Sequence, residues 1–222
     1  MNDDFIFRIL FLALFIVWHA IKGYYALKGR TLGKKRSPRE RLREAVQLEG
    51  KASVILWEVH NTCWFIAIVL YLLFSPWMLW AQLPMPSWLR WIGVGAATAF
   101  LPLLLWAHRT LSKHWSKWLE IPEKLVTSGP YSRVRHPIYT HWLTINVTLV
   151  MVSANLFLLL VYPFSIVLIY ARIGKEEKML LEQFGDEYRA YMKRTGRLLP
   201  RFRQYIRGVK LIVVKHRKRR KT

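Results

Sequence analysis

The sequence predicts an all-α integral membrane protein with about five transmembrane helices, a C-terminal helical hairpin and a cytoplasmic helical lid. Hydrophobic residues make up 53% of the 222 residues, although the formal net charge is +22. The apolar and the charged residues are segregated into blocks, which is the arrangement that a bilayer requires. The 11 Trp residues suit the membrane interface, where the ring contacts acyl chains and the N–H faces the headgroups.

Each predicted helix corresponds to one apolar segment. The first three segments reach the roughly 20 residues that a helix needs to cross a bilayer. The fourth is short for a span, and only Ala154 and Asn155 separate it from the fifth, so these two form a tight antiparallel hairpin. The segments cover approximately residues 5–27, 53–80, 88–111, 137–153 and 156–173.

The loops predict the orientation, because cytoplasmic loops are enriched in Lys and Arg. Residues 28–43, residues 113–135 and the part after residue 173 are all basic, whereas residues 81–87 carry no charge. With five spans the basic regions fall on one side. We therefore expect the N-terminus outside and the C-terminus in the cytoplasm.

Three further pieces belong to the cytoplasmic side. Residues 39–51 suggest a short helix lying in the interface. Residues 175–192 predict a helical lid that breaks at Gly185, and residues 201–222 form a basic tail suited to anionic lipid headgroups. A basic tail can also bind nucleic acid, but nothing else in the chain resembles a nucleic-acid fold, so we expect no nucleic-acid partner.

Ionisable residues within the apolar segments concentrate at their cytoplasmic ends, which predicts a cavity open to the cytosol. His60 is notable because Trp57, His60, Asn61 and Trp64 share one helical face. This face suits either a substrate-facing wall or simple packing. The single cysteine, Cys63, excludes a multi-cysteine metal site, and we expect no metal.

Residues 125–139 contain the densest group of functional signals. Gly129 and Pro130 predict a turn, and Pro137 fits the first turn of the next helix. The free amides at that helix start, beside Arg135 and His136, can hold a carboxylate.

Two tyrosines of the same segment suit a ligand that carries an adenine or a positively charged sulfonium. Tyr131 and Tyr139 could stack on an adenine or line a sulfonium, whose positive charge is attracted to aromatic faces. Further along, Arg172 and Glu176 are four residues apart, and Glu177 follows. A carboxylate there could accept two ribose hydroxyls, although Arg172 and Glu176 could also form an ordinary helix-surface ion pair.

These motifs resemble the isoprenylcysteine carboxyl methyltransferase family and its relatives, including phospholipid N-methyltransferases. The similarity covers roughly residues 115–200. Its signature, in order, is Gly129-Pro130-Tyr131, Arg135-His136-Pro137-Ile138-Tyr139, a short helical hairpin, Glu176-Glu177, Phe184-Gly185-x-x-Tyr188-x-x-Tyr191, and Arg197-x-x-Pro200.

The resemblance implies an S-adenosylmethionine-dependent methyltransferase that acts on a lipophilic acceptor at the cytoplasmic face. Arg172 would face the substrate, with Glu177 as a candidate catalytic residue, and Ser116 occupies a less secure cofactor position. The implied cofactor-binding residues are Lys124, Leu125, Val126, Tyr131, Arg135, His136, Pro137, Ile138, Tyr139 and Glu176.

The sequence departs from the family pattern at three positions. Glu123 replaces a frequent histidine, His141 replaces a small residue and Asn146 replaces a glycine. We therefore expect an altered acceptor pocket with His141, Asn146 and His60 among its residues, and do not assume a prenylated cysteine as the substrate. The predicted units are a three-helix membrane region (1–112), a methyltransferase core (113–200) and the basic tail (201–222).

The expected reaction is an in-line displacement at a sulfonium methyl group, for which the protein chiefly positions and desolvates the reactants. A carboxylate acceptor needs no base, whereas an amine or a thiol could use Glu177, His60 or His141. Two alternatives stay open: an NADPH-dependent sterol or lipid reductase, and a non-catalytic membrane scaffold. The oligomeric state is not predicted.

Overall fold

The computed structural model describes residues 3–32, 37–73, 76–111 and 119–201. Their secondary structure is helical. The elements are α1 (Asp3–Leu32), α2 (Pro38–Glu49), α3 (Lys51–Leu73), the short 3₁₀ helix η1 (Pro76–Ala81), α4 (Ser87–Leu111), the 3₁₀ turn η3 (Gly129–Ser132), α5 (Pro137–Ser153) and α6 (Leu156–Arg194). Ser116 and nearly all of the predicted basic tail lie outside the described residues.

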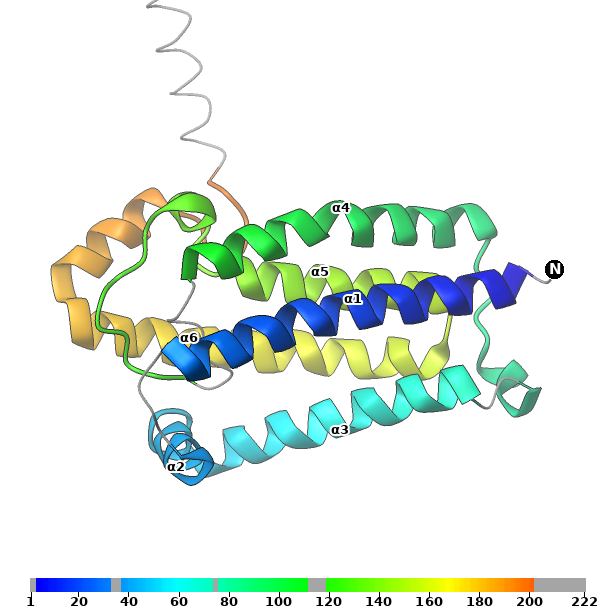
Figure 1. Cartoon of the computed structure of the whole chain (residues 1–222), viewed down its shortest axis with the longest axis horizontal. Helices are drawn as coiled ribbons and strands as arrows, with labels where there is room; N and C mark the ends of the chain where they lie inside the picture. Colours follow the sequence, from blue (N-terminus) through cyan, green and yellow to red (C-terminus); the bar gives the residue numbers. More distant parts are fainter. Residues whose placement is uncertain (1–2, 33–36, 74–75, 112–118, 202–222) are drawn as a thin grey trace, which may run out of the picture.

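The long helices α1, α3, α4, α5 and α6 form one elongated bundle in which successive members run in opposite directions (Figure 1). The N-terminus lies at the end of the bundle opposite to α2 and to the last part of α6. The predicted hairpin of α5 and α6 is confirmed. Ala154 ends α5 in the left-handed conformation (φ 48°), and the Asn155 side chain accepts hydrogen bonds from the first amides of α6.

Among the described residues, four helices are long and apolar enough to cross a membrane: α1, α3, α4 and α6. The predicted fourth segment is α5, which has 17 residues. At 1.5 Å per residue it is about 26 Å long, shorter than the roughly 30 Å hydrocarbon layer. The expected count of five therefore corresponds to five bundle helices, of which α5 is too short to count as a span by itself.

The outer surface of the bundle is apolar where a soluble protein would be polar. Large hydrophobic side chains such as Phe65, Trp88, Phe164 and Val167 are more than half exposed. The core is also apolar, and its fully buried members include Phe11, Ile145, Leu149 and Leu158. Because apolar side chains face both inward and outward, the bundle is suited to lipid as its solvent.

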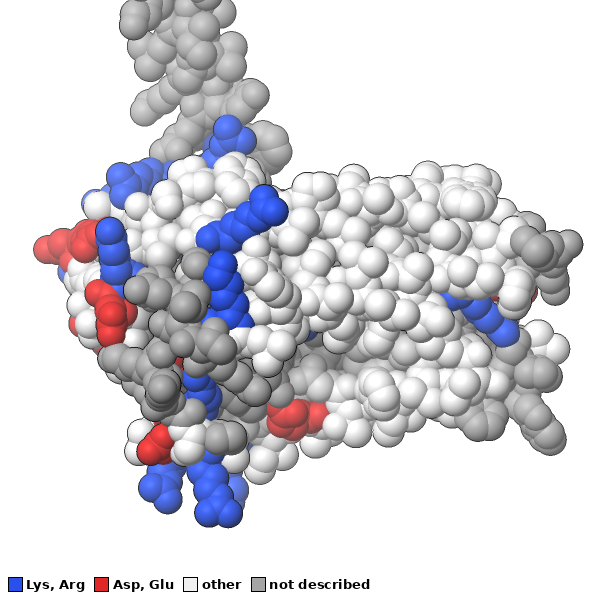
Figure 2. Space-filling model, in the orientation of Figure 1, with Lys and Arg blue, Asp and Glu red and all other residues white. Residues whose placement is uncertain are grey.

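Charged side chains gather at the end of the bundle that holds α2 and the last part of α6, while the adjoining flank is almost uncharged (Figure 2). At the opposite end, Arg90 is buried and pairs with Asp4 at 2.5 Å. Its guanidinium also lies 3.9 Å from the centre of the Phe7 ring. The predicted segregation of charge thus follows the long axis of the bundle.

Two helical elements predicted at the charged end are confirmed with small changes of boundary. The helix of residues 39–51, which we expect to lie in the interface, is α2, and it begins after a capping box made by Ser37 and Glu40. The lid is the continuation of α6 beyond the bundle, where Gly185 has φ 50° and interrupts the helix. This left-handed conformation favours glycine, and it turns the last part of α6 back toward the loop of residues 119–128 (Figure 1).

Candidate functional site

Two adjoining cavities lie at the charged end of the bundle. The smaller, of about 140 Å³, is bounded by residues 119–126, η3 and α6. The larger, of about 430 Å³, extends into the bundle between α1, α3, α5 and α6. The residues common to both linings are Leu111, Tyr131, Arg135, Tyr139, Arg172 and Glu176. We call these six residues the junction.

The turn that carries Tyr131 is fixed by close packing on α4. Gly129 has φ 58°, and a Cβ atom at this position would lie 2.6 Å from Oγ1 of Thr110. Glycine therefore meets both the conformational and the steric requirement, as the predicted turn suggested. Pro137 occupies the first turn of α5, and His136 is the residue that precedes it.

The smaller cavity brings together most of the predicted cofactor-binding residues: Lys124, Leu125, Val126, Tyr131, Arg135, Tyr139 and Glu176. Burial, followed by the negative charge of Glu176, raises the pKa of Tyr131 well above its ordinary value, so the phenol stays protonated. The lid adds Tyr188 and Tyr191, and the Tyr191 hydroxyl donates to the main-chain oxygen of Tyr131 at 2.7 Å.

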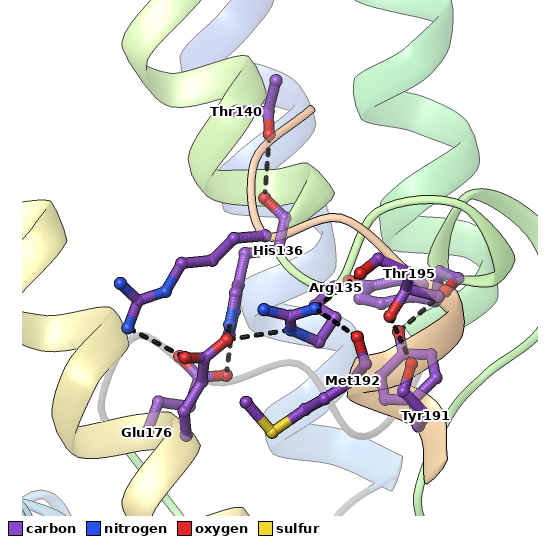
Figure 3. A network of polar contacts seen from close by, with 10 residues as sticks. Arg135, His136, Thr140, Glu176, Tyr191, Met192 and Thr195 are labelled. Carbon is purple, nitrogen blue, oxygen red and sulfur yellow. Dashed lines mark hydrogen bonds and ion pairs between the residues drawn. The ribbon is translucent and has the colours of Figure 1, made fainter. Parts of the chain in front are cut away.

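A buried ionic network lies beside this cavity (Figure 3). The Glu177 carboxylate accepts a hydrogen bond from Nε of Arg135 at 2.9 Å and lies 2.8 Å from Nη2 of Arg197. Nε2 of His136 lies 3.3 Å from the same carboxylate. A carboxylate of the chain itself thus lies near the start of α5, where it contacts the side chains of Arg135 and His136.

Arg135 has further partners that fasten the lid. Its Nη1 donates to the main-chain oxygens of Met192 and Thr195 at 3.2 and 2.7 Å. The backbone amide of Arg135 donates to the oxygen of Gly196 at 2.8 Å, and that of His136 to the oxygen of Arg197 at 3.1 Å. The Arg-His-Pro motif and the Arg197 motif, about 60 residues apart in the sequence, are therefore in direct contact.

Arg172 lies on the junction and has a buried partner from another helix. Its Nη2 is 3.2 Å from Oε1 of Glu49, the last residue of α2, and both side chains are at most 5% exposed. The guanidinium also lies 5.2 Å from the centre of the Trp57 ring. The sequence left open an ordinary ion pair of Arg172 with Glu176 within α6, whereas Glu49 forms this ion pair with Arg172 from outside the region of family resemblance.

The larger cavity combines an apolar wall with a few polar groups. Trp57 and Asn61 come from the helical face predicted as a possible substrate wall, and Ile138 and Trp142 come from α5. The α1 side contributes His19, Lys22, Gly23 and Ala26. Nζ of Lys22 lies 4.5 Å from the centre of the Trp18 ring. A long apolar molecule with one polar end would match such a lining.

Several predicted site residues lie elsewhere. His60 is buried, and its Nε2 is 2.9 Å from Oγ of Ser165. His141 and Asn146 are fully buried between α5 and its neighbours, and Asn146 donates to the main-chain oxygen of Trp142. In the described part of the chain these three residues line neither cavity, and their surroundings are those of packed helix interfaces.

Four other residues also differ from the expected arrangement. Pro137 and Glu177 line neither cavity, and Glu177 is committed to the cations of the network instead. His136 and Ile138 line the larger cavity and not the smaller one. The arrangement therefore argues against Glu177 as a catalytic group, because a carboxylate bound by two guanidinium groups is a poor proton acceptor.

Sequence reasoning missed Glu49 and the contribution of α1. Glu49 ends a helix rich in charged residues, so nothing in the sequence distinguishes it from the exposed Glu40 or the partly exposed Glu44. A lysine near the end of an apolar segment, such as Lys22, commonly extends to the headgroups and so does not by itself indicate a site. The small residues Gly23 and Ala26, one turn after His19 and Lys22 respectively, were the available signal for a cavity on that face.

The comparisons with known proteins point to one family. The isoprenylcysteine carboxyl methyltransferase family matches residues 92–182, which extend from α4 into α6. The methanethiol S-methyltransferase of Pseudomonas sp. (strain GM41(2012)) is 30% identical over 156 residues, which cover 62% of this chain and 57% of the relative. The protein-S-isoprenylcysteine O-methyltransferase of Mus musculus is 35% identical over 88 residues, or 39% of this chain and 30% of the relative.

A solved structure agrees with the fold. The eukaryotic intramembrane Ras methyltransferase ICMT superposes with a TM-score of 0.50 and 19% identity, covering 80% of this chain and 73% of that chain. The chain spans less than two thirds of the length of the two sequence relatives. The matched residues nevertheless include all six junction residues and also Glu177, the partner of Arg135, so the resemblance to the isoprenylcysteine carboxyl methyltransferase family that the motifs predicted covers the candidate site.

Proposed function

We propose that this protein transfers a methyl group from S-adenosylmethionine to a lipophilic acceptor. The observation that carries the proposal is the junction, where a cavity at the charged end of the bundle meets a cavity inside the apolar bundle. A water-soluble donor and a lipid-soluble acceptor could approach from these two directions. The family that matches residues 92–182 is a methyltransferase family, which supports the same class of reaction.

The smaller cavity suits the donor chemically. Tyr131, Tyr139 and Tyr188 offer aromatic faces, which attract a sulfonium cation, and Glu176 offers a negative charge. The Tyr188 hydroxyl is buried and has no hydrogen-bond partner among the described residues, which is consistent with a polar ligand in this cavity. Leu125 and Leu180 provide an apolar surface for a base.

The larger cavity suits the acceptor. Trp57, Trp142 and Ile138 can surround an apolar chain, while Arg172 and Asn61 can orient its polar end. The relatives are named for isoprenylcysteine and for methanethiol, an oxygen and a sulfur acceptor respectively. We include carboxylate, thiol and amine acceptors in the proposal.

In the proposed mechanism the main role of the protein is to position the donor and the acceptor. S-adenosylmethionine, when bound, supplies an already activated methyl group. Arg172 orients the acceptor at the junction, and the tryptophans of the larger cavity exclude water from it. A carboxylate acceptor needs no base, whereas for a thiol or an amine Glu176 is the carboxylate that reaches both cavities. We place this site at the cytoplasmic face because the basic loops lie at the same end.

The experiment uses detergent-purified full-length protein. Calorimetry measures binding of S-adenosylmethionine, of its demethylated product and of NADPH, and radiolabelled methyl transfer is then measured with an isoprenylcysteine, an alkanethiol and total membrane lipid. Binding of the adenosyl ligands together with label transfer is the expected result. Binding of NADPH alone would support a reductase, and binding of none of the three by folded protein would support a scaffold; either result overturns the proposal.

A further inference from the structure

The carboxylate of Glu49 occupies an unusual position. It belongs to the last residue of the interface helix α2, and the residue is 2% exposed. A negative charge at the C-terminal end of a helix is opposed by the helix dipole, and burial of a charge adds a desolvation cost. Local helix energetics therefore oppose a glutamate here, and its contacts must compensate for that cost.

Those contacts lead to the proposed active site. Oε1 of Glu49 lies 3.2 Å from Nη2 of Arg172 and accepts a hydrogen bond from the backbone amide of Leu119 at 3.1 Å. Arg172 belongs to the junction, and Leu119 belongs to the wall of the smaller cavity. One carboxylate thus contacts both the arginine between the cavities and the wall of one of them.

A separate contact holds α2 in place without the Glu49 side chain. Nζ of Lys175 donates to the main-chain oxygen of Glu49. Nη1 of Arg41 also lies 3.5 Å from Oε1 of Glu120 in the same wall. The side chain of Glu49 can therefore be changed while the other connections between α2 and the site remain.

Without Glu49, Arg172 would keep the Trp57 ring and the Tyr139 side chain as neighbours and would lose the buried carboxylate that lies against Nη2. The orientation of a guanidinium on a flexible stem is then less restricted. An orienting residue in a displacement reaction is sensitive to such a change, since a misplacement of about 1 Å can cost about 100-fold in rate.

We propose that Glu49 is a positioning residue, which acts through Arg172 to orient the acceptor at the junction. This inference rests on the proposed function and adds α2 to the elements that form the proposed active site. It predicts that loss of the Glu49 charge weakens the binding and the orientation of the acceptor. Donor binding should be nearly retained, because the tyrosines and Glu176 of the smaller cavity are unchanged.

The test compares Glu49→Gln with wild-type protein, using radiolabelled S-adenosylmethionine with an isoprenylcysteine and with an alkanethiol as probe acceptors. We expect kcat/KM for the active probe to fall by about tenfold or more, with a raised acceptor KM, while the donor dissociation constant changes by less than about threefold. Glu49→Asp keeps the charge and should recover part of the loss. Glu40→Gln, in the same helix, removes an exposed charge and keeps a residue that can form the capping box, so it should resemble wild type.

Thermal unfolding of each variant separates positioning from folding. If Glu49→Gln unfolds early but its folded fraction has wild-type kcat and acceptor KM, Glu49 is structural and the inference is wrong. If its folded yield is too low to assay, Glu49→Asp decides, because wild-type kinetics in that variant with a shorter reach to Arg172 would also contradict positioning. Inactive wild-type protein that binds no donor would instead contradict the proposed function.

Discussion

Nε of Arg135 lies 2.9 Å from Oε1 of Glu177, and this buried pair joins the segment just before α5 to the part of α6 that leaves the bundle. Arg197 binds the second oxygen of the same carboxylate at 2.8 Å. Because the three charges come from segments far apart in the sequence, the network fastens the lid to the bundle.

Glu177→Gln should therefore destabilise the protein. Removal of one partner of a buried ion pair typically costs about 3–5 kcal/mol, since the remaining charges lose their compensation. The measurement is the unfolding midpoint in detergent, with Glu182→Gln as the control because Glu182 belongs to an exposed pair with Lys178. A variant with wild-type stability but no methyl transfer would instead support the catalytic role that the sequence suggested.

Glu176→Ala should abolish donor binding while the protein stays folded and inserted in the membrane. The side chain belongs to the junction and supplies negative charge beside the tyrosines of the smaller cavity. Calorimetry with S-adenosylmethionine measures the effect, and Glu182→Ala on the same helix is the matched control. Unchanged donor affinity in Glu176→Ala would remove the smaller cavity as the donor site.

Gly23→Trp should block the larger cavity. Gly23 lines this cavity, and a Cβ atom built at the position meets no atom within 4 Å, so a large side chain can be accommodated without displacing the helix. We expect kcat/KM for a lipophilic acceptor to fall by about tenfold or more, with donor binding unchanged.

Gly95→Trp is the control for this substitution. Gly95 is an exposed helical glycine of α4 that also has open space around it, and it lines neither cavity. If Gly23→Trp transfers methyl groups as well as Gly95→Trp does, the acceptor does not occupy the larger cavity.

The proposed orientation can be tested with single cysteines in a Cys63→Ser background. Pro84 precedes α4 at the end of the bundle opposite to α2, whereas Arg43 lies on α2 at the charged end, and both are exposed. With a membrane-impermeant thiol reagent on intact cells, Pro84→Cys should react and Arg43→Cys should react only after permeabilisation. The reverse result would place the site on the outer face.

The sequence predicted the five bundle helices because each contains a contiguous apolar segment, although the second segment continues to residue 80 whereas α3 ends at Leu73. Pro137 and the Ala154–Asn155 turn marked both ends of α5, and Gly185 marked the break in α6. Contacts within one segment or one motif are encoded locally, so composition and turn residues reveal them. The short length of α5 was visible for the same reason.

Contacts between segments were harder to predict. The chain gives no local signal that Glu49 meets Arg172, 123 residues later, since the pairing depends on where α2 lies against α6. Likewise, His60 and His141 have the residue type of catalytic bases, but their burial in helix interfaces is set by the rotation of each helix about its axis. A rotation of this kind is a property of the assembled bundle.

The junction places Arg172 and Glu176 four residues apart on one uninterrupted part of α6. Four residues correspond to a rise of about 6 Å and to little more than one helical turn, so both side chains project from the same face of α6. In the proposed reaction the relative position of the two reactants is thus set by helix pitch, and it requires no motion of one domain relative to another. Inserting a single residue between these two positions would rotate one of them by about 100° and separate donor from acceptor without altering any functional side chain.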